Sequence, residues 1–198
     1  MSSSYTFKLG VNLNETGEPF ERAVELAAEL GAGYAEFFVT DPSHLTEAGA
    51  ASYRRRLEAH GLQVHGIGCT PNPFKELHID QIELAELPTH PVFAHDLDLV
   101  RRSIDFCQAV GGQNVRVHGF AWPGEYQAGR RVSRTWPQRY ATRGGEIPAP
   151  VLDKLVKAWS TVADLAEQHD IDIAIGMMPW NYTNTSRNFP RISQIRLK

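Results

Sequence analysis

Short apolar runs alternate along the chain with longer segments in which apolar residues recur at helical spacing. In one such segment Phe20, Ala23, Val24, Ala27 and Leu30 share a helical face, with proline before it and glycine after it. The apolar runs predict five strands, at residues 8–13, 34–39, 62–68, 114–118 and 171–177. The helical segments predict helices at residues 19–31, 42–60, 97–110 and 152–166. This alternation is typical of parallel βαβ units with right-handed crossovers.

Residues 119–147 interrupt the alternation with a long connection that contains Trp122, Trp136 and five arginines. A connection of this length is typical of a functional lid or of a disordered insert, and its aromatic content favours the lid. It also follows the carboxyl end of a predicted strand, where α/β folds form their sites. We therefore expect a long loop or lid at residues 119–147.

Length and composition indicate one globular domain over residues 1–198, with 42% hydrophobic and 22% charged residues. The formal net charge of −3 gives no nucleic-acid-binding footprint. The chain has neither a signal peptide nor an apolar stretch of the roughly 18 residues that a membrane span needs, which predicts a cytoplasmic protein without membrane contact. Cys69 and Cys107 are too few for a disulfide framework, so we expect reduced thiols.

Four segments in order carry a likeness to a known family. They read KLGVN at residues 8–12, AAELGAGYAEF at 27–37, SIDFCQAVGGQNVRVHG at 103–119 and IAIGMMPW at 173–180. Together they resemble the xylose isomerase-like TIM barrel superfamily, which includes sugar isomerases and epimerases and the AP endonuclease family 2 enzymes. The resemblance implies an eight-stranded βα barrel with a site at the carboxyl ends of its strands. It also implies a divalent metal, Mn²⁺ or Mg²⁺, that assists proton transfer at a carbon next to a carbonyl.

The sequence departs from the family pattern at its fifth strand and beyond. Gly176 stands where the family has a metal-binding glutamate, and glycine has no side chain to ligate a metal. A complete barrel of this type needs about 250 residues. Residues 188–192 are not expected to form a helix, because Pro190 interrupts them. We expect an α/β fold of TIM-barrel type that is C-terminally truncated, with about five of eight strand–helix units, and no bound metal.

Two residues are the candidates for catalysis, His118 and Glu36. His118 ends a predicted strand, where a barrel presents side chains to its site; the alternative is a structural histidine hydrogen-bonded at the strand end. Glu36 lies within an apolar strand, and burying an unpaired carboxylate is costly. It is therefore either a site residue or one half of an ion pair with an arginine such as Arg116.

Four residues are candidates for substrate binding, Asn12, His65, Trp122 and Trp180. Asn12 ends the first predicted strand and would hydrogen-bond a sugar hydroxyl or cap a turn. His65 lies on the third strand. Its side chain reaches the site only if the pleat of the strand directs it inward; the alternative is a packed or merely polar position. The two tryptophans would stack on the apolar face of a sugar ring or serve in packing.

These features predict a sugar isomerase/epimerase-like protein that acts on a small sugar or polyol, with weak or absent activity. The alternative is a non-catalytic or vestigial fragment of the same fold. A metal-dependent DNA-repair endonuclease is disfavoured, because residues 1–176 hold all 23 acidic but only 16 of the 20 basic residues. Open barrel edges would favour self-association, or a partner that carries the missing strands.

Overall fold

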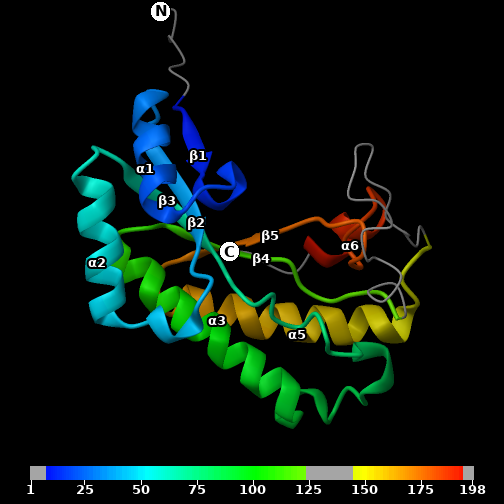
Figure 1. The fold of residues 1–198 in the computed structure, drawn as a ribbon. Helices are drawn as coiled ribbons and strands as arrows, with labels where there is room; N and C mark the ends of the chain where they lie inside the picture. Colours follow the sequence, from blue (N-terminus) through cyan, green and yellow to red (C-terminus); the bar gives the residue numbers. More distant parts are fainter. Residues whose placement is uncertain (1–7, 124–144, 194–198) are drawn as a thin grey trace, which may run out of the picture. The chain divides into compact units, whose positions relative to one another are not determined.

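A computed structural model describes residues 8–123 and 145–193 of the chain (Figure 1). Five parallel strands form one sheet in the order β1-β2-β3-β4-β5, which confirms the predicted α/β fold class. The strands are β1 (Gly10–Asn12), β2 (Tyr34–Phe38), β3 (Gln63–Gly68), β4 (Asn114–Val117) and β5 (Asp172–Ile175). The helices are α1 (Phe20–Glu29), α2 (Glu47–Glu58), α3 (Pro91–Val110), α5 (Ala149–Glu167) and α6 (Asn188–Ser193). Most of the predicted lid, residues 124–144, lies outside the described residues.

The chain divides into two compact units. Unit 1 comprises residues 1–71, 102–116 and 169–172, and unit 2 comprises residues 72–101, 117–168 and 173–198. The single domain expected over residues 1–198 stays a prediction.

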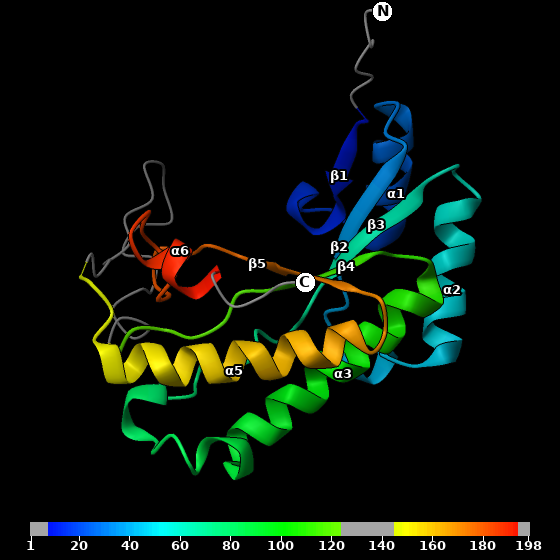
Figure 2. The ribbon, with the colours of Figure 1, turned by 180° about the vertical axis from the view of Figure 1, so that it is seen from behind.

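In unit 1 the two faces of β2 have different roles. Ala35 and Phe37 are fully buried, and the Phe37 ring packs against Phe20 of α1 and Tyr53 of α2, with centroids 5.5 and 5.3 Å away. Figure 2 shows β1, β2 and β3 side by side with α1 and α2 next to them. The other face of β2, which carries Glu36, is only half-buried, and we call it the open face.

The strand register decides which residues share the open face. Asn12 of β1 is level with Glu36, and Glu36 is level with Gly66 of β3. Val64 pairs with the residue before Glu36, so His65 is an extra residue, a bulge, in β3. The bulge leaves the His65 side chain exposed.

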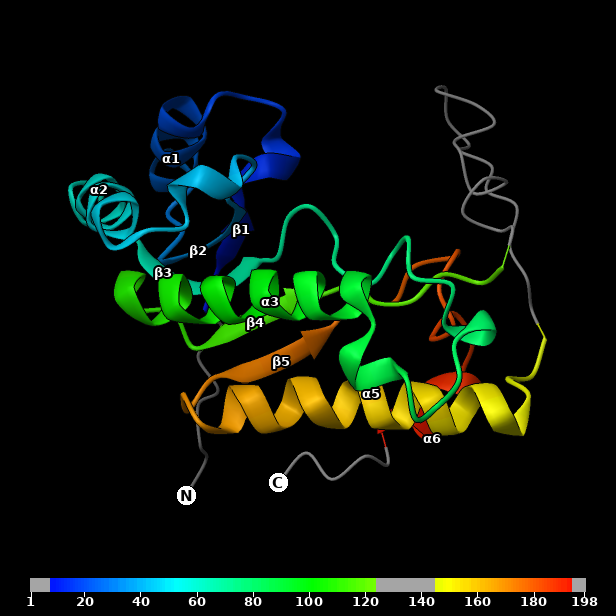
Figure 3. The same ribbon diagram turned by 90° about the horizontal axis from the view of Figure 1, so that it is seen from below.

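The core of unit 2 is an aromatic cluster of Phe74, Phe93, Phe120 and Trp159. Phe74 and Phe120 stack with centroids 5.0 Å apart, and Trp159 of α5 meets Phe120 edge-on at 5.8 Å. The 3-10 turns at Ile79–Gln81 and Leu87–Thr89 lie against α5 (Figure 3).

Three helix predictions were wrong in detail. The helix expected at residues 97–110 is α3, which already begins at Pro91. The helix expected at residues 42–60 is a 3-10 turn, Pro42–His44, followed by α2. Leu45 leaves helical backbone geometry at ψ 65°, and the Thr46 hydroxyl then caps α2 by accepting the backbone N–H of Gly49 at 3.1 Å.

Residues 188–192 were also expected to be non-helical, but they lie in α6. Pro190 stands in the first turn of this helix, where its missing N–H is not needed. The Thr185 hydroxyl accepts the backbone N–H of Asn188 at 3.1 Å and so stabilises the start of α6.

None of the helices within residues 8–123 and 145–193 has the length and apolar composition that a membrane crossing requires.

Candidate functional site

The carboxyl ends of β4 and β5 meet in unit 2 at His118 and Gly176. The backbone N–H of Gly176 donates to the carbonyl oxygen of Val117 at 2.8 Å, which continues the pairing of the two strands. The half-buried imidazole of His118 lies over Gly176, because a Cβ built on Gly176 would overlap its Nδ1 and Cε1 atoms. The position at which the resemblance implies a metal-binding glutamate therefore serves here as the packing surface of a histidine ring.

Asn181 holds these two strand ends together from a fully buried position. Its side-chain amide donates to the carbonyl oxygens of His118 at 2.7 Å and of Gly176 at 2.8 Å. Its carbonyl accepts the backbone N–H of Met178 at 3.3 Å and the Thr183 hydroxyl at 2.7 Å. Because every polar atom of this amide has a partner, its burial stabilises a single geometry at the two strand ends.

Trp122 and Trp180 are both buried, each with 5% of its surface exposed. The Trp122 ring lies against that of Tyr182, with centroids 4.2 Å apart, and the Trp122 backbone N–H donates to the carbonyl of Trp180 at 3.0 Å. These contacts are those of packing residues, the alternative that the sequence left open. Their role in substrate stacking stays a prediction.

Glu36 forms an ion pair on the open face of unit 1. Its Oε1 lies 2.8 Å from Nε of Arg116, and about a quarter of each side chain is exposed. The Arg116 guanidinium also lies over the Phe38 ring, 4.8 Å from its centroid. The ion pair that the sequence offered as the alternative for Glu36 is therefore present.

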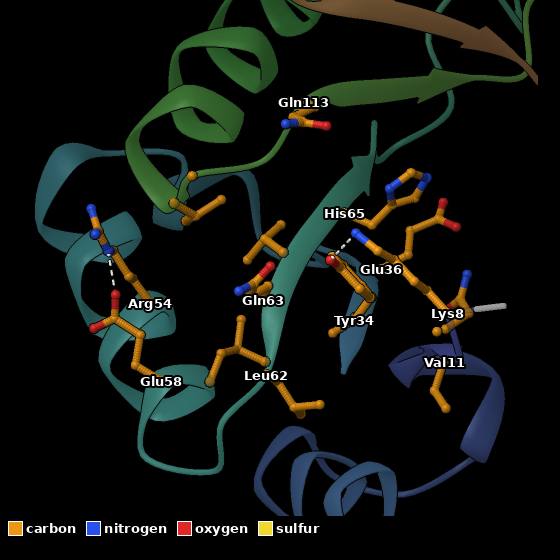
Figure 4. A pocket seen from close by; sticks show the side chains of 17 residues that line it. Lys8, Val11, Tyr34, Glu36, Arg54, Glu58, Leu62, Gln63, His65 and Gln113 are labelled. Atoms are coloured by element: carbon orange, nitrogen blue, oxygen red, sulfur yellow. Dashed lines mark hydrogen bonds and ion pairs between the residues drawn. The ribbon is translucent and has the colours of Figure 1, made fainter. Parts of the chain in front are cut away.

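Unit 1 contains a pocket of about 760 Å³ lined by residues of β1, β2 and β3 and by the C-terminal ends of α2 and α3. We call it the amino-end pocket, because Tyr34 and Gln63 in its lining are the first residues of β2 and β3. The side chains of Glu36, His65, Lys8 and Tyr34 gather on one side of it in Figure 4, with Arg54 and Glu58 on the other.

The structure brings three of the six predicted site residues together and leaves three in the other unit. Asn12, Glu36 and His65 line the amino-end pocket. His118, Trp122 and Trp180 belong to unit 2. The resemblance implies a site at the carboxyl ends of the strands, whereas the lining of this pocket includes the first residues of β1, β2 and β3.

Three residues that shape these sites were not among the predicted site residues: Lys8, Tyr34 and Asn181. Lys8 donates a hydrogen bond from Nζ to the hydroxyl of Tyr34 at 2.7 Å, and both line the pocket. Their signal was weak, because each is the first residue of a predicted strand, and the apolar pattern assigns no function to such a position. Asn181 was visible only as part of an Asn-x-Thr pattern, whose two polar side chains bond to each other.

The residues present do not fit the divalent metal that the resemblance implies. Within the described parts of the chain, no group of three or more His, Cys, Asp or Glu side chains could hold a metal ion together. Gly176 supplies no ligand atom, and the space for a side chain there is filled by His118. The Glu36 carboxylate is already paired with Arg116.

The family model described as xylose isomerase-like TIM barrel matches residues 24–196 of the chain. A search of curated proteins found none that matches this chain.

Solved structures with a similar fold include three of related kinds. A D-tagatose 3-epimerase-like protein superimposes with a TM-score of 0.63 at 16% identity, over 94% of this chain and 60% of that one. A xylose isomerase domain protein from Planctomyces limnophilus superimposes with a TM-score of 0.55 at 16% identity, over 87% of this chain and 54% of that one. An AP endonuclease of family 2 from Brucella melitensis superimposes with a TM-score of 0.53 at 13% identity, over 96% of this chain and 64% of that one. The chain thus spans between half and two thirds of the length of these structures.

Proposed function

The chain belongs to the xylose isomerase-like TIM barrel family, and we propose that it is a sugar isomerase/epimerase-like protein that binds a small sugar or polyol. The family match over residues 24–196 carries the proposal. Support comes from the amino-end pocket, in which Asn12, Glu36 and His65 offer hydrogen-bonding groups from three adjacent strands. A pocket of about 760 Å³ is large enough for a monosaccharide.

We assign proton transfer, where it occurs, to His118 at the carboxyl end of β4. His118 is not part of the lining of the amino-end pocket, so a sugar bound in that pocket is not in contact with it. An imidazole can take up and release a proton near neutral pH, as the removal of a proton beside a carbonyl requires. Asn181 is the residue that positions His118, through its bond to the His118 carbonyl. Glu36 remains the second catalytic candidate, with its carboxylate held in place by Arg116.

Turnover is weak or absent in this proposal. Isomerisation beside a carbonyl develops negative charge on an oxygen, which an enzyme must stabilise. The glutamate position at the end of β5 is glycine, and the Glu36 carboxylate is engaged by an arginine. A fold that binds the sugar and catalyses slowly, or not at all, agrees with both observations.

The test measures binding and proton exchange separately. We expect saturation-transfer NMR to show contact with D-fructose and D-sorbitol, and Asn12→Ala to weaken that contact. In deuterated water, exchange of the fructose protons on C1 and C3, beside the carbonyl, should stay near the rate without protein, with or without Mn²⁺. The Asn184→Ala variant, outside the pocket lining, is the control for Asn12→Ala.

Two results would overturn the proposal in different parts. If neither sugar contacts the protein, sugar binding is rejected. If Mn²⁺ brings rapid exchange that His118→Gln abolishes, the chain is an active metal-assisted enzyme, and weak turnover is rejected.

A further inference from the structure

The amino-end pocket is lined by two cations, Lys8 and Arg54, and two carboxylates, Glu36 and Glu58, and both carboxylates are already paired with arginines. Arg54 and Glu58, one turn apart on α2, form an ion pair in the lining, with Nε 2.7 Å from Oε1. Glu36 is paired with Arg116. The remaining formal charge in the lining is the ammonium of Lys8.

Lys8 is held in place by a group that does not neutralise it. Its Nζ donates to the Tyr34 hydroxyl at 2.7 Å and lies 4.9 Å from the centroid of the same ring. The Tyr34 hydroxyl is a hydrogen-bond partner without a formal negative charge, so it directs the ammonium without acting as its counterion. Among the described residues Lys8 Nζ makes this one hydrogen bond, so two of its three N–H donors are left for a ligand.

Neutral hydrogen-bonding groups surround this cation. The amide side chains of Gln63 and Gln113 line the pocket and, within the described residues, make no hydrogen bond. The Asn12 carbonyl oxygen accepts the backbone N–H of Asn14 at 3.2 Å, which leaves its NH₂ group to donate. The imidazole of His65 stands on the same side of the pocket as Lys8 (Figure 4).

From this arrangement we propose that the amino-end pocket takes a polyol that carries one anionic group, a carboxylate or a phosphate. Lys8 binds the anion, and the amides and His65 bind hydroxyl groups. This inference rests on the proposed function, since it names the class of sugar that the protein binds. A neutral sugar leaves the Lys8 charge without a counterion and binds more weakly.

The test is a calorimetric titration with three probes: D-gluconate, D-glucose 6-phosphate and the neutral D-sorbitol. We expect at least one anion to bind about tenfold more tightly than sorbitol, because hydrogen bonds to charged groups are the stronger ones. High salt should weaken anion binding and leave sorbitol binding unchanged.

Two variants locate the effect at Lys8. Lys8→Met should remove the preference for the anion, so that the affinities of this variant for the anion and for sorbitol agree within about twofold. The control is Arg22→Gln, which removes the same charge from a cation that is ion-paired with Glu25 and Glu29 on α1. It should leave the preference intact.

The outcomes show whether the anion site fails alone or together with the proposed sugar binding. If sorbitol binds as tightly as both anions, the anion site is rejected and the sugar-binding protein stands. If Lys8→Met and Arg22→Gln weaken the anions equally, the preference is a general charge effect, and the site is rejected too. If no probe binds, both proposals fail. Binding of one anion alone identifies carboxylate or phosphate as the group recognised.

Discussion

Gly176 shows how one missing side chain fixes the position of another. Because a Cβ at this position would overlap the His118 ring, Gly176→Ala should push the imidazole aside. We expect a loss of about 1–3 kcal/mol in the free energy of unfolding, as for other overpacked sites. Denaturant unfolding measures the loss, and the shift of the His118 Cε1–H resonance reports the movement of the ring.

The control for Gly176→Ala is Gly33→Ala. A Cβ on Gly33 would meet no atom within 4 Å, and its backbone does not adopt a positive φ. This variant should stay within about 0.5 kcal/mol of the unchanged protein. Equal losses in the free energy of unfolding for both variants would show that the replacement of glycine by alanine in the backbone, and not the overlap with the His118 ring, causes the loss.

Cys107 gives the protein a pH dependence in the alkaline range. Burial raises the pKa of its thiol to about 11, from an ordinary value of 9.0. Below pH 9.0 the thiol is protonated in both the folded and the unfolded chain, so its titration costs no stability. As the pH rises from 9.0 to about 11 only the unfolded chain ionises, and the free energy of unfolding falls by roughly 2–3 kcal/mol.

The measurement is denaturant unfolding across this pH range in the unchanged protein and in Cys107→Ala. Other groups also titrate there, and Tyr53 is one whose pKa burial raises. The difference between the two proteins isolates Cys107. The alanine variant should lose less stability on going to high pH, and an equal loss in both would contradict the shifted thiol pKa.

At the scale of elements, α6 is hydrogen-bonded to the residues just before α5. Asn188 is fully buried, and its amide donates to the Gly145 carbonyl at 2.9 Å while its carbonyl accepts the Ile147 N–H at 3.3 Å. Asn188→Ala leaves both backbone groups without these bonds. We expect the free energy of unfolding to fall by about 1–3 kcal/mol in denaturant titrations.

Arg187→Ala, one residue before Asn188, is the matched control. Its side chain is exposed, so the change should stay within about 0.5 kcal/mol. If Asn188→Ala costs no more than Arg187→Ala, the two bonds to residues 145 and 147 contribute nothing to stability.

Periodicity predicted the order of strands and helices, because burial of one face imposes the spacing of apolar residues. It failed where a local hydrogen bond decides. Thr46 starts α2 later than expected, and Thr185 lets a helix begin just before Pro190. A motif that combines a capping hydroxyl with proline in the next turn would have identified the second case.

The candidate site was predictable to a smaller extent. Glu36 could be paired with Arg116 from the cost of a lone buried carboxylate. His118 could be placed at a strand end. The packing of its ring on Gly176 and the bonds of Asn181 depend on contacts between distant segments, which the spacing of residues does not record.

At the scale of the whole molecule, the strand order places β1 and β5 at its ends, each with one neighbouring strand among the described residues. The backbone groups on the far side of such a strand are open to pairing with another chain. Two of the large apolar side chains that the described residues expose stand beside these strands, Leu9 before β1 at 53% and Met177 after β5 at 58%. We therefore predict self-association through these edges.

Light scattering coupled to size-exclusion chromatography should give a mass above the 22.1 kDa of one chain at micromolar concentration. Charged side chains, lysine above all, oppose edge-to-edge pairing. The double variant Leu9→Lys/Met177→Lys should therefore shift the protein toward the monomer. Leu30→Lys adds a lysine at the C-terminal end of α1, where Leu30 is 68% exposed, and should leave the mass unchanged. A monodisperse monomer before any substitution contradicts edge pairing, and an equal response to Leu30→Lys assigns the association to apolar surface in general.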